Sequence, residues 1–375
     1  MFSRDPVKSW LYDRNCCHIR PLWETTLPID HRWLRLRSNS SDIIFNAEKQ
    51  FALHRGSAEL EPSRAPVTIE FYCIGFSSSM DGSGFNRTAA NLALNVPKDM
   101  KPTRISKNGL FHWKKDGFDC FWRPNDLLLS FPEALDRPVR ILMTNPRVKD
   151  HSSLAPKRLR IKGRMTIPEN MQDVMDLVKI AFIRRIGTFC IHGSVLADGD
   201  RGVVLIGPSG VGKSTTALTL FRDGFDLFSD EYTLILYDGN KEVLVGGLLI
   251  QPMLAGDFQA GLEATLGVDP CVGKKRVMLP QDRLRRSKNR WCRPHAVFFL
   301  ERPDEHRLQH SFVKICRQES FVGIMNAALD FGHGYAQKER MEAFIQLSQA
   351  CLSFRLVLGR DLNSLAESIR HCMRS

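Results

Sequence analysis

The sequence has no apolar run that approaches the roughly 20 residues a helix needs to span a bilayer. Its opening stretch, MFSRDPVKSWLYDRNCC, carries charge throughout and lacks the apolar core of a signal peptide. Ten cysteines are present, but none forms a C-x-x-C pair and no Cys/His cluster has zinc spacing. We therefore expect a soluble cytoplasmic protein with reduced thiols and no membrane partner.

Internal repeats and long low-complexity tracts are also missing from the sequence, which excludes a repeat array. A chain of 375 residues with 43% hydrophobic and 25% charged residues can bury a sizeable core, and two domains are expected. The formal net charge is +12. This excess favours anionic partners such as nucleotides, acidic peptides, nucleic acid or a membrane surface, without choosing among them.

The N-terminal part reads as short strands and turns. Arg32–Ser38 alternates in polarity, and Val67–Phe76 is rich in β-branched and aromatic residues, so both are predicted strands. Ser77–Asn86 and Arg123–Pro138 carry the punctuation of loops. Basic residues alternate with apolar ones along Lys157–Met165, as in an anion-binding strip or in a strand with one solvated face.

Near Thr166 the residue pattern changes from short strands and turns to helical spacing. Thr166–Gly187 has apolar residues at helical spacing and is predicted to be a docked amphipathic helix. Thr188–Ala197 and Gly202–Gly207 are β-rich runs joined by the turn signal DGD. We expect a β-rich N-terminal domain over residues 1–160, for acceptor or partner recognition, and an α/β domain over residues 161–375.

The α/β domain contains a phosphate-binding signature, GPSGVGKS, which satisfies G-x-x-x-x-G-K-[ST]. Its glycines allow backbone N–H groups to point at phosphate oxygens, while Lys213 reaches the terminal phosphates and Ser214 ligates magnesium. A mere glycine turn between strand and helix explains neither Lys213 nor Ser214. The candidate nucleotide-binding residues are Gly207, Pro208, Ser209, Gly210, Val211, Gly212, Lys213, Ser214 and Thr215.

Two adjacent carboxylates, Asp230 and Glu231, follow the short predicted strand Phe225–Ser229. A strand–helix–strand crossover is normally right-handed and parallel, so this strand should end at the edge of the sheet that holds the phosphate loop. There, one carboxylate can help hold magnesium while the other accepts the proton of an attacking hydroxyl. The alternative is that both acids cap a strand end and face water.

Taken together, these segments resemble the C-terminal catalytic domain of the HPr serine kinases. The matching pieces are the helix before IHGSVL, then GVVLIGPSGVGKSTTAL, DGFDLFSDE and FRLVLGRDLNSLAESI, which together span most of residues 166–375. The resemblance implies a P-loop kinase domain of the HPr kinase/PEP carboxykinase-like type. Such kinases transfer phosphate to a serine hydroxyl of a protein or peptide, and some relatives act on small molecules.

By this resemblance Lys213 and Ser214 hold phosphate and magnesium, and Asp230 is the general base. His192 matches the histidine of the strand before the loop and lies close to the acids; taken alone, it also reads as a hydrogen-bonded core histidine. Glu231 stands where the family has a second aspartate, and it either ligates magnesium or assists the base.

Two further departures from the family pattern are present. Thr215 stands where a Glu follows the GKS of the kinases proper. The family's later glycine- and arginine-rich signature, associated with reversing the reaction, is missing. The missing signature points away from a dual kinase/phosphorylase and toward a divergent relative with another acceptor.

Two weaker signals lie further along. Gly273–Arg293 is dense in Lys and Arg, so Lys274, Lys275 and Arg276 are candidates to neutralise phosphates, or they belong to a solvated basic loop. A single aromatic in that patch disfavours nucleic-acid readout. Glu301 ends an apolar strand and competes for the metal-binding acid of an ordinary P-loop hydrolase, although we prefer a plain core strand.

We therefore expect a kinase that uses ATP and Mg²⁺ and acts on a hydroxyl, with serine as the expected group. The acceptor is a peptide, a small protein or a metabolite, and a homo-oligomer is possible because kinases of this family commonly assemble. One alternative is a non-catalytic ATP-binding sensor. Another is a nucleic-acid-associated ATPase that draws on the positive charge.

Overall fold

The protein divides into two compact units. The computed structural model describes residues 23–29, 32–38, 40–50, 66–74, 103–104, 111–115, 118–123, 127–132, 137–144, 171–237, 242–248, 253–255, 268–269, 274–277, 291–301, 308–329 and 337–374. Of these residues, those up to Ile186 form the first unit and those from Gly187 onward form the second. This division lies C-terminal to the boundary after residue 160 that the sequence suggested.

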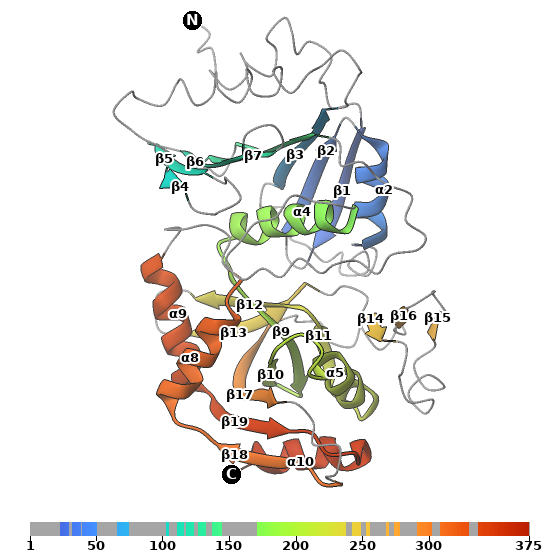
Figure 1. Cartoon of the computed structure of the whole chain (residues 1–375), viewed down its shortest axis with the longest axis vertical. Helices are drawn as coiled ribbons and strands as arrows, with labels where there is room; N and C mark the ends of the chain where they lie inside the picture. Colours follow the sequence, from blue (N-terminus) through green and yellow to red (C-terminus); the bar gives the residue numbers. More distant parts are fainter. Residues whose placement is uncertain are drawn as a thin grey trace, which may run out of the picture. The chain divides into compact units, whose positions relative to one another are not determined.

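The N-terminal unit is one mixed eight-stranded sheet with helices, in the strand order β1-β2-β3-β8-β7-β6-β5-β4 (Figure 1). Its elements are β1 Trp23–Ile29, β2 Arg32–Ser38, α2 Ser41–Gln50, β3 Val67–Ile74, β4 Thr103–Arg104, β5 Phe111–Lys115, β6 Phe118–Arg123, β7 Leu127–Pro132, β8 Val139–Thr144 and α4 Met171–Arg185. Strands β2 and β3 confirm the predicted strands, whereas the loop predicted at residues 77–86 and the basic run at 157–165 lie outside the described residues.

Strand β7 corrects the loop predicted over Arg123–Pro138. Leu129 and Phe131 are buried, and so is Ser130 between them. The proline, asparagine and aspartate signals of this stretch lie outside the strand or at its last residue, so they mark the ends of β7 rather than a continuous loop.

Helix α4 belongs to this N-terminal unit because its basic end packs on the unit's sheet. The buried guanidinium of Arg184 pairs with the carboxylate of Asp119 and lies 4.1 Å from the ring centroid of Phe131. The next residue, Arg185, donates to the main-chain oxygen of Pro132. The sequence had suggested that this helix belongs to the second unit. These contacts explain why it belongs to the first.

The C-terminal unit combines a larger sheet with helices and a small separate sheet. Its elements are β9 Phe189–Asp198, β10 Arg201–Ile206, α5 Lys213–Arg222, β11 Asp226–Ser229, β12 Tyr232–Tyr237, β13 Val243–Gly247, β14 Met253–Ala255, β15 Val268–Asp269, β16 Lys274–Val277, β17 Trp291–Glu301, β18 Ser311–Lys314, α8 Arg317–Ala327, α9 Gln337–Ala350, β19 Leu352–Val357, the 3₁₀ turn η2 Leu362–Ser364 and α10 Leu365–Cys372. Strands β14, β16 and β15 pair in that order, separately from the larger sheet.

Strand pairing in the larger sheet closes on itself. The order is β10-β9-β12-β13-β17-β19-β18, and β10 also pairs with β17, so β10, β9, β12, β13 and β17 form a ring. The two long strands make this possible: β9 pairs with β12 in its first half and with β10 in its second, while β17 begins beside β13 and continues between β10 and β19. Strands β10, β17 and β19 are parallel.

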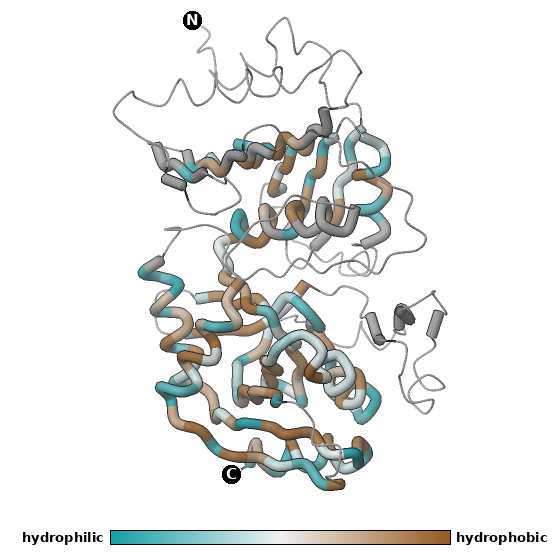
Figure 2. Tube along the Cα trace, in the orientation of Figure 1, coloured by the Kyte–Doolittle hydropathy of each residue, from teal (hydrophilic) through white to brown (hydrophobic). Residues whose placement is uncertain are grey.

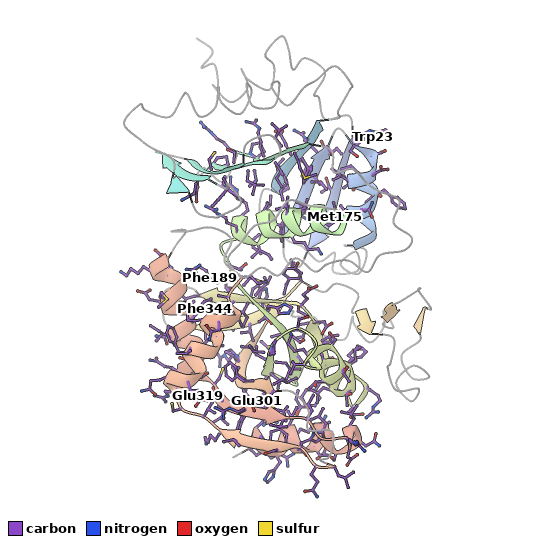
Figure 3. All side chains as sticks on the ribbon, in the orientation of Figure 1. Trp23, Met175, Phe189, Glu301, Glu319 and Phe344 are labelled. Carbon is purple, nitrogen blue, oxygen red and sulfur yellow. The ribbon has the colours of Figure 1, made fainter. Side chains whose placement is uncertain are left out.

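Apolar side chains fill both faces of the parallel strands. The hydropathy colouring of the trace shows hydrophobic stretches in the C-terminal unit (Figure 2). Leu205 and Phe298 face helices α5 and α10, whereas Val204 and Val297 belong to a second cluster with residues of α8 and α9. Phe189 and Phe344 lie edge to face with their ring centroids 6.4 Å apart (Figure 3). The predicted C-terminal helices and the strand between them are thus confirmed as scaffold.

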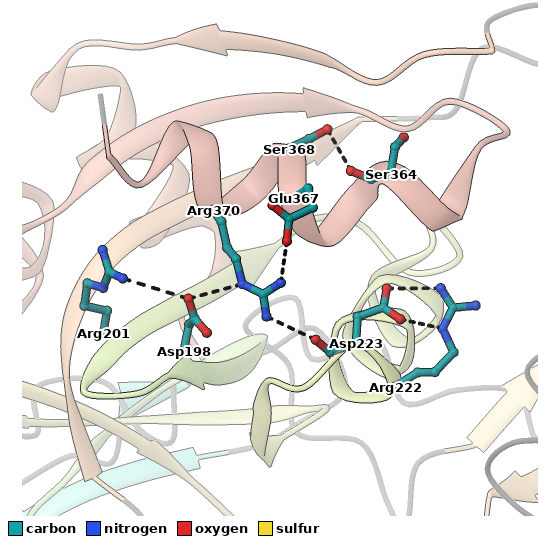
Figure 4. A network of polar contacts seen from close by, with 8 residues as sticks. All are labelled: Asp198, Arg201, Arg222, Asp223, Ser364, Glu367, Ser368 and Arg370. Atoms are coloured by element: carbon teal, nitrogen blue, oxygen red, sulfur yellow. Dashed lines mark hydrogen bonds and ion pairs between the residues drawn. The ribbon is translucent and has the colours of Figure 1, made fainter.

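A polar network joins α10 to the β9–β10 hairpin and to the end of α5 (Figure 4). Arg370 donates to the carboxylates of Asp198 and Glu367 and to the main-chain oxygen of Asp223, and it stacks over the ring of Phe225 at 4.8 Å. One guanidinium therefore links the β9–β10 hairpin, the end of α5 and α10.

Among the described residues, no helix is long and apolar enough to cross a membrane.

Replacing Arg370 with alanine should destabilise the C-terminal unit by about 1–3 kcal/mol, because several hydrogen bonds and a cation–π contact are lost together. Urea unfolding of the full chain measures the change. Arg374→Ala, at an exposed position just beyond α10, is the matched control and should shift stability by less than about 0.5 kcal/mol. Equal shifts for the two variants would show that the network does not stabilise the fold.

Candidate functional site

The Gly207–Ser214 segment connects the carboxyl end of β10 to the start of α5, which is the strand–loop–helix context that its sequence predicts. Gly210 and Gly212 adopt φ angles of 83° and 104°, in the left-handed region that side chains other than glycine rarely occupy. Val211 between them is buried in the core that α5 covers. The turn is therefore anchored by one apolar side chain and shaped by two glycines.

Lys213, the first residue of α5, folds back over this turn. Its ammonium group donates to the main-chain oxygens of Gly207 at 2.7 Å and Pro208 at 3.0 Å, and the residue is buried. The positive charge is thus held at the mouth of the loop, beside the N-terminus of a helix, where anions are favoured.

The two acids lie at the same sheet edge as this loop. Strand β11 ends at Ser229, and both β10 and β11 run antiparallel to β9, which lies between them; they are therefore parallel to each other. This arrangement confirms the predicted parallel crossover. Asp230 and Glu231 follow β11 directly, so they lie on the edge where β10 passes into the phosphate loop.

The carboxyl group of Asp230 lies at the centre of a cluster of polar side chains that includes Ser194 and Ser214. The hydroxyl of Ser194 lies 3.1 Å from its Oδ1 atom and 3.0 Å from its main-chain oxygen, and the hydroxyl of Ser214 also donates to the carboxylate. Burial raises the pKa of Asp230 to about 7; the hydroxyls of Ser214 and Ser194 and the charge of Lys213 act to lower it, while Glu231 raises it. A carboxyl group with this pKa can exchange a proton near neutrality.

His192 and Glu231 are brought to the same place by backbone pairing. His192 faces Tyr232 across the β9–β12 ladder, and the main-chain N–H of Gly193 donates to the oxygen of Glu231 at 3.2 Å. Glu231 is exposed, whereas His192 is half-buried. The phosphate loop, both acids and the histidine thus share one edge, as the sequence predicted.

Two serines of this cluster were not singled out from the sequence. Ser194 and Ser229 are both fully buried in strands. The Ser229 hydroxyl accepts the main-chain N–H groups of Tyr232 at 3.0 Å and Glu231 at 3.4 Å, and so fixes the turn that carries the acids. A hydroxyl inside an apolar strand is the signal that was available, because a buried hydroxyl needs a partner.

The structure places the two weaker candidates, the basic residues at 274–276 and Glu301, in different strands. Lys274, Lys275 and Arg276 lie in β16, paired with β14, and nothing is described of their side chains. Glu301 shares the face of β17 opposite α5, and its carboxylate lies 3.0 Å from Arg355, which also pairs with Glu319 (Figure 3). This ion-pair arrangement agrees with the interpretation of β17 as a core strand.

The residues present suit a phosphate–magnesium ligand. Ser214 and Asp230 offer oxygen donors, the type that Mg²⁺ prefers, and they lie next to the loop that would hold the phosphates. Among the described residues, no three His, Cys, Asp or Glu side chains gather into a metal-binding group. A cation bound mainly through phosphate oxygens and one or two protein ligands fits this donor set.

Comparison with known proteins gives a limited similarity. No family model matches the sequence. A 51-residue stretch is 39% identical to HPr kinase/phosphorylase of Mycoplasmopsis pulmonis, covering 14% of this chain and 16% of that protein. The similarity is to an HPr kinase, and it is partial. The aligned part is thus a small fraction of the relative's length.

A solved structure of a similarly named protein also aligns with the chain, but only weakly. The Hpr(Ser) kinase/phosphatase from Coxiella burnetii aligns with 50% of this chain and 99% of its own, at 13% identity and a TM-score of 0.27. A TM-score this low carries no argument about fold or function. The short sequence match therefore indicates a distant, partial similarity to one HPr kinase/phosphorylase.

The raised pKa of Asp230 gives a testable pH dependence of stability. The folded state binds this proton more tightly than the unfolded chain, so the stabilising contribution is full below the ordinary value of 3.8 and is lost as pH rises through about 7. Between pH 5 and pH 8 the wild type should therefore lose about 2–3 kcal/mol more stability than Asp230→Asn.

Urea unfolding in the presence of a chelator measures this difference, and the Asn variant cancels the contributions of all other titrating groups. Identical pH dependence in the two proteins would mean that the carboxyl group titrates in its ordinary range.

Proposed function

We propose that the C-terminal unit is an ATP- and Mg²⁺-dependent kinase of the HPr kinase type, which transfers the γ-phosphate to a hydroxyl group, with serine as the expected acceptor. The observation that carries this proposal is the contact between Ser214 of the phosphate loop and Asp230 after β11. It joins a predicted phosphate- and metal-binding residue to a carboxylate of near-neutral pKa at a single sheet edge.

In this proposal, the backbone N–H groups of the loop and the Lys213 ammonium bind the phosphates of ATP. The acceptor oxygen forms a bond to the γ-phosphorus as the bond from that phosphorus to the β–γ bridging oxygen breaks, and ADP leaves. The proton of the acceptor hydroxyl passes to the Asp230 carboxylate, which its partners Ser194 and Ser214 keep in one orientation.

Magnesium would be held by the Ser214 hydroxyl together with phosphate oxygens, with the carboxylate of Asp230 or Glu231 beside it. When bound, it neutralises charge on the phosphates. Glu231 is exposed, so its carboxylate is accessible to a ligand, whereas Asp230 is half-buried and is held by the hydroxyls of Ser194 and Ser214. This difference in setting supports separate roles for the two acids, with the less exposed Asp230 as base.

The N-terminal unit and the Lys274–Arg276 strand are proposed to select the acceptor. The net charge of +12 favours an acidic peptide, small protein or phosphorylated metabolite over a basic one. The oligomeric state of the kinase can be determined separately, by measuring its size in solution.

Labelled transfer tests the function directly. Purified protein is incubated with γ-labelled ATP, Mg²⁺ and a lysate or serine-containing peptide pool. Wild type should label an acceptor, and Asp230→Asn should reduce the rate by about 10²–10⁴-fold, since proton removal is lost while the phosphate site remains. Its dissociation constant for MgATP, measured by calorimetry, should stay within a few-fold of wild type.

Lys213→Ala is the companion variant, because it removes the cation that faces the phosphates and should weaken both nucleotide binding and transfer. Tight MgATP binding without transfer of label to any acceptor would contradict the kinase proposal and favour a non-catalytic ATP-binding sensor. Salt-sensitive binding to DNA or RNA with stimulated hydrolysis would favour the nucleic-acid-associated ATPase.

A further inference from the structure

Ser194 occupies the point where strand β9 changes its pairing partner. His192 still pairs with β12, whereas Gly193 and Ser194 pair with Ile206 and Leu205 at the end of β10. Residues 192, 194 and 196 alternate onto one face of the strand, and Leu196 lies in the core that α5 covers. The Ser194 side chain is therefore directed to the α5 face, close to where the phosphate loop begins.

The hydroxyl of Ser194 is fully buried and is committed to a single neighbour. Its one proton is shared between the main-chain oxygen of Asp230 at 3.0 Å and the Oδ1 atom at 3.1 Å. A donor that spans both groups fixes the side-chain rotation of Asp230 relative to its own backbone. Ser214, the other hydroxyl donor to this carboxylate, comes from a different element, the start of α5.

We propose that Ser194 is a positioning residue that holds the Asp230 carboxylate in its proton-accepting orientation. This inference rests on the kinase function proposed above. Ser214 is expected to turn toward magnesium when nucleotide binds, and its hydroxyl then no longer restrains Asp230. Ser194 is fully buried in β9 and is not part of the phosphate loop, so we expect it to keep its hydrogen bond throughout the reaction.

The difference between the two hydroxyls gives them separate effects on catalysis. Loss of Ser214 should disturb nucleotide and metal binding together with turnover. Loss of Ser194 should lower kcat and leave KM for ATP nearly unchanged, because the hydroxyl makes no contact with substrate and acts through the carboxylate. A charge-assisted hydrogen bond of this kind corresponds to a drop in kcat of about 10-fold or more.

The experiment measures release of labelled phosphate from MgATP with water as the acceptor, so it needs no knowledge of the natural acceptor. Ser194→Thr and Ser194→Val form the decisive pair, because the two side chains have nearly the same shape and differ only in the hydroxyl. Thr should retain most of the wild-type kcat, whereas Val and Ser194→Ala should lose it, with KM for ATP within about 2-fold of wild type.

Ser353→Ala is the matched control for loss of a buried hydroxyl. Ser353 lies in β19 of the same sheet and donates to Ser320 at 2.8 Å, away from Asp230. It should lower the melting temperature without changing kcat. Equal kcat values for the Thr and Val variants would overturn the inference and leave Ser194 with a structural role.

Combining variants separates this inference from the function on which it rests. If Ser194 acts through Asp230, Ser194→Ala should add no further loss of rate to Asp230→Asn. A rate loss in Asp230→Asn without any in Ser194→Ala overturns the positioning role alone. An Asp230→Asn enzyme as fast as wild type overturns the assignment of the base, and the positioning role with it.

Discussion

The close approach of two backbones at Gly193 is the constraint on which the candidate site depends. A Cβ atom at this position would lie 2.7 Å from the main-chain oxygen of Leu205, so a side chain there would push β9 away from β10. The N–H of the same glycine donates to Glu231. The strand before the phosphate loop and the turn that carries the acids are therefore both held to one short piece of β9. Any residue larger than glycine would separate the groups that have to cooperate.

Local sequence predicted the parts of the site whose residues are close along the chain. The strand, loop, helix and second strand from residue 202 to 229 were recognisable because their glycine spacing, apolar runs and turn signals are short-range features. Ser194 was missed because its partner Asp230 lies 36 positions away and no local pattern records that pairing. The closure of β10 on β17 is a long-range pairing of the same kind.

Strand β7 and the division between the units show a second limit of the sequence. Three leucines between prolines read as loop until the neighbouring strands β6 and β8 supply hydrogen bonds on both sides. The apolar spacing of helix α4 predicts a packed face, but it does not identify the sheet on which that face packs. The helix was therefore assigned to the second domain. Its attachment through Arg184 to Asp119 depends on residues from a strand far back in the chain.

Strand pairing also bears on how this protein can change its specificity. The segment between β13 and β17 leaves and re-enters the ring at adjacent, paired positions, with Gly246 opposite Trp291 and Val245 opposite Cys292. Its ends are therefore fixed one strand spacing apart whatever lies between them. Because closing a loop costs only about 0.6 kcal/mol more for each doubling of its length, insertions there are cheap in stability. If the proposed kinase function holds, rebuilding this segment, basic strand included, would give new acceptors while the strand ends that carry the phosphate loop stay unaltered.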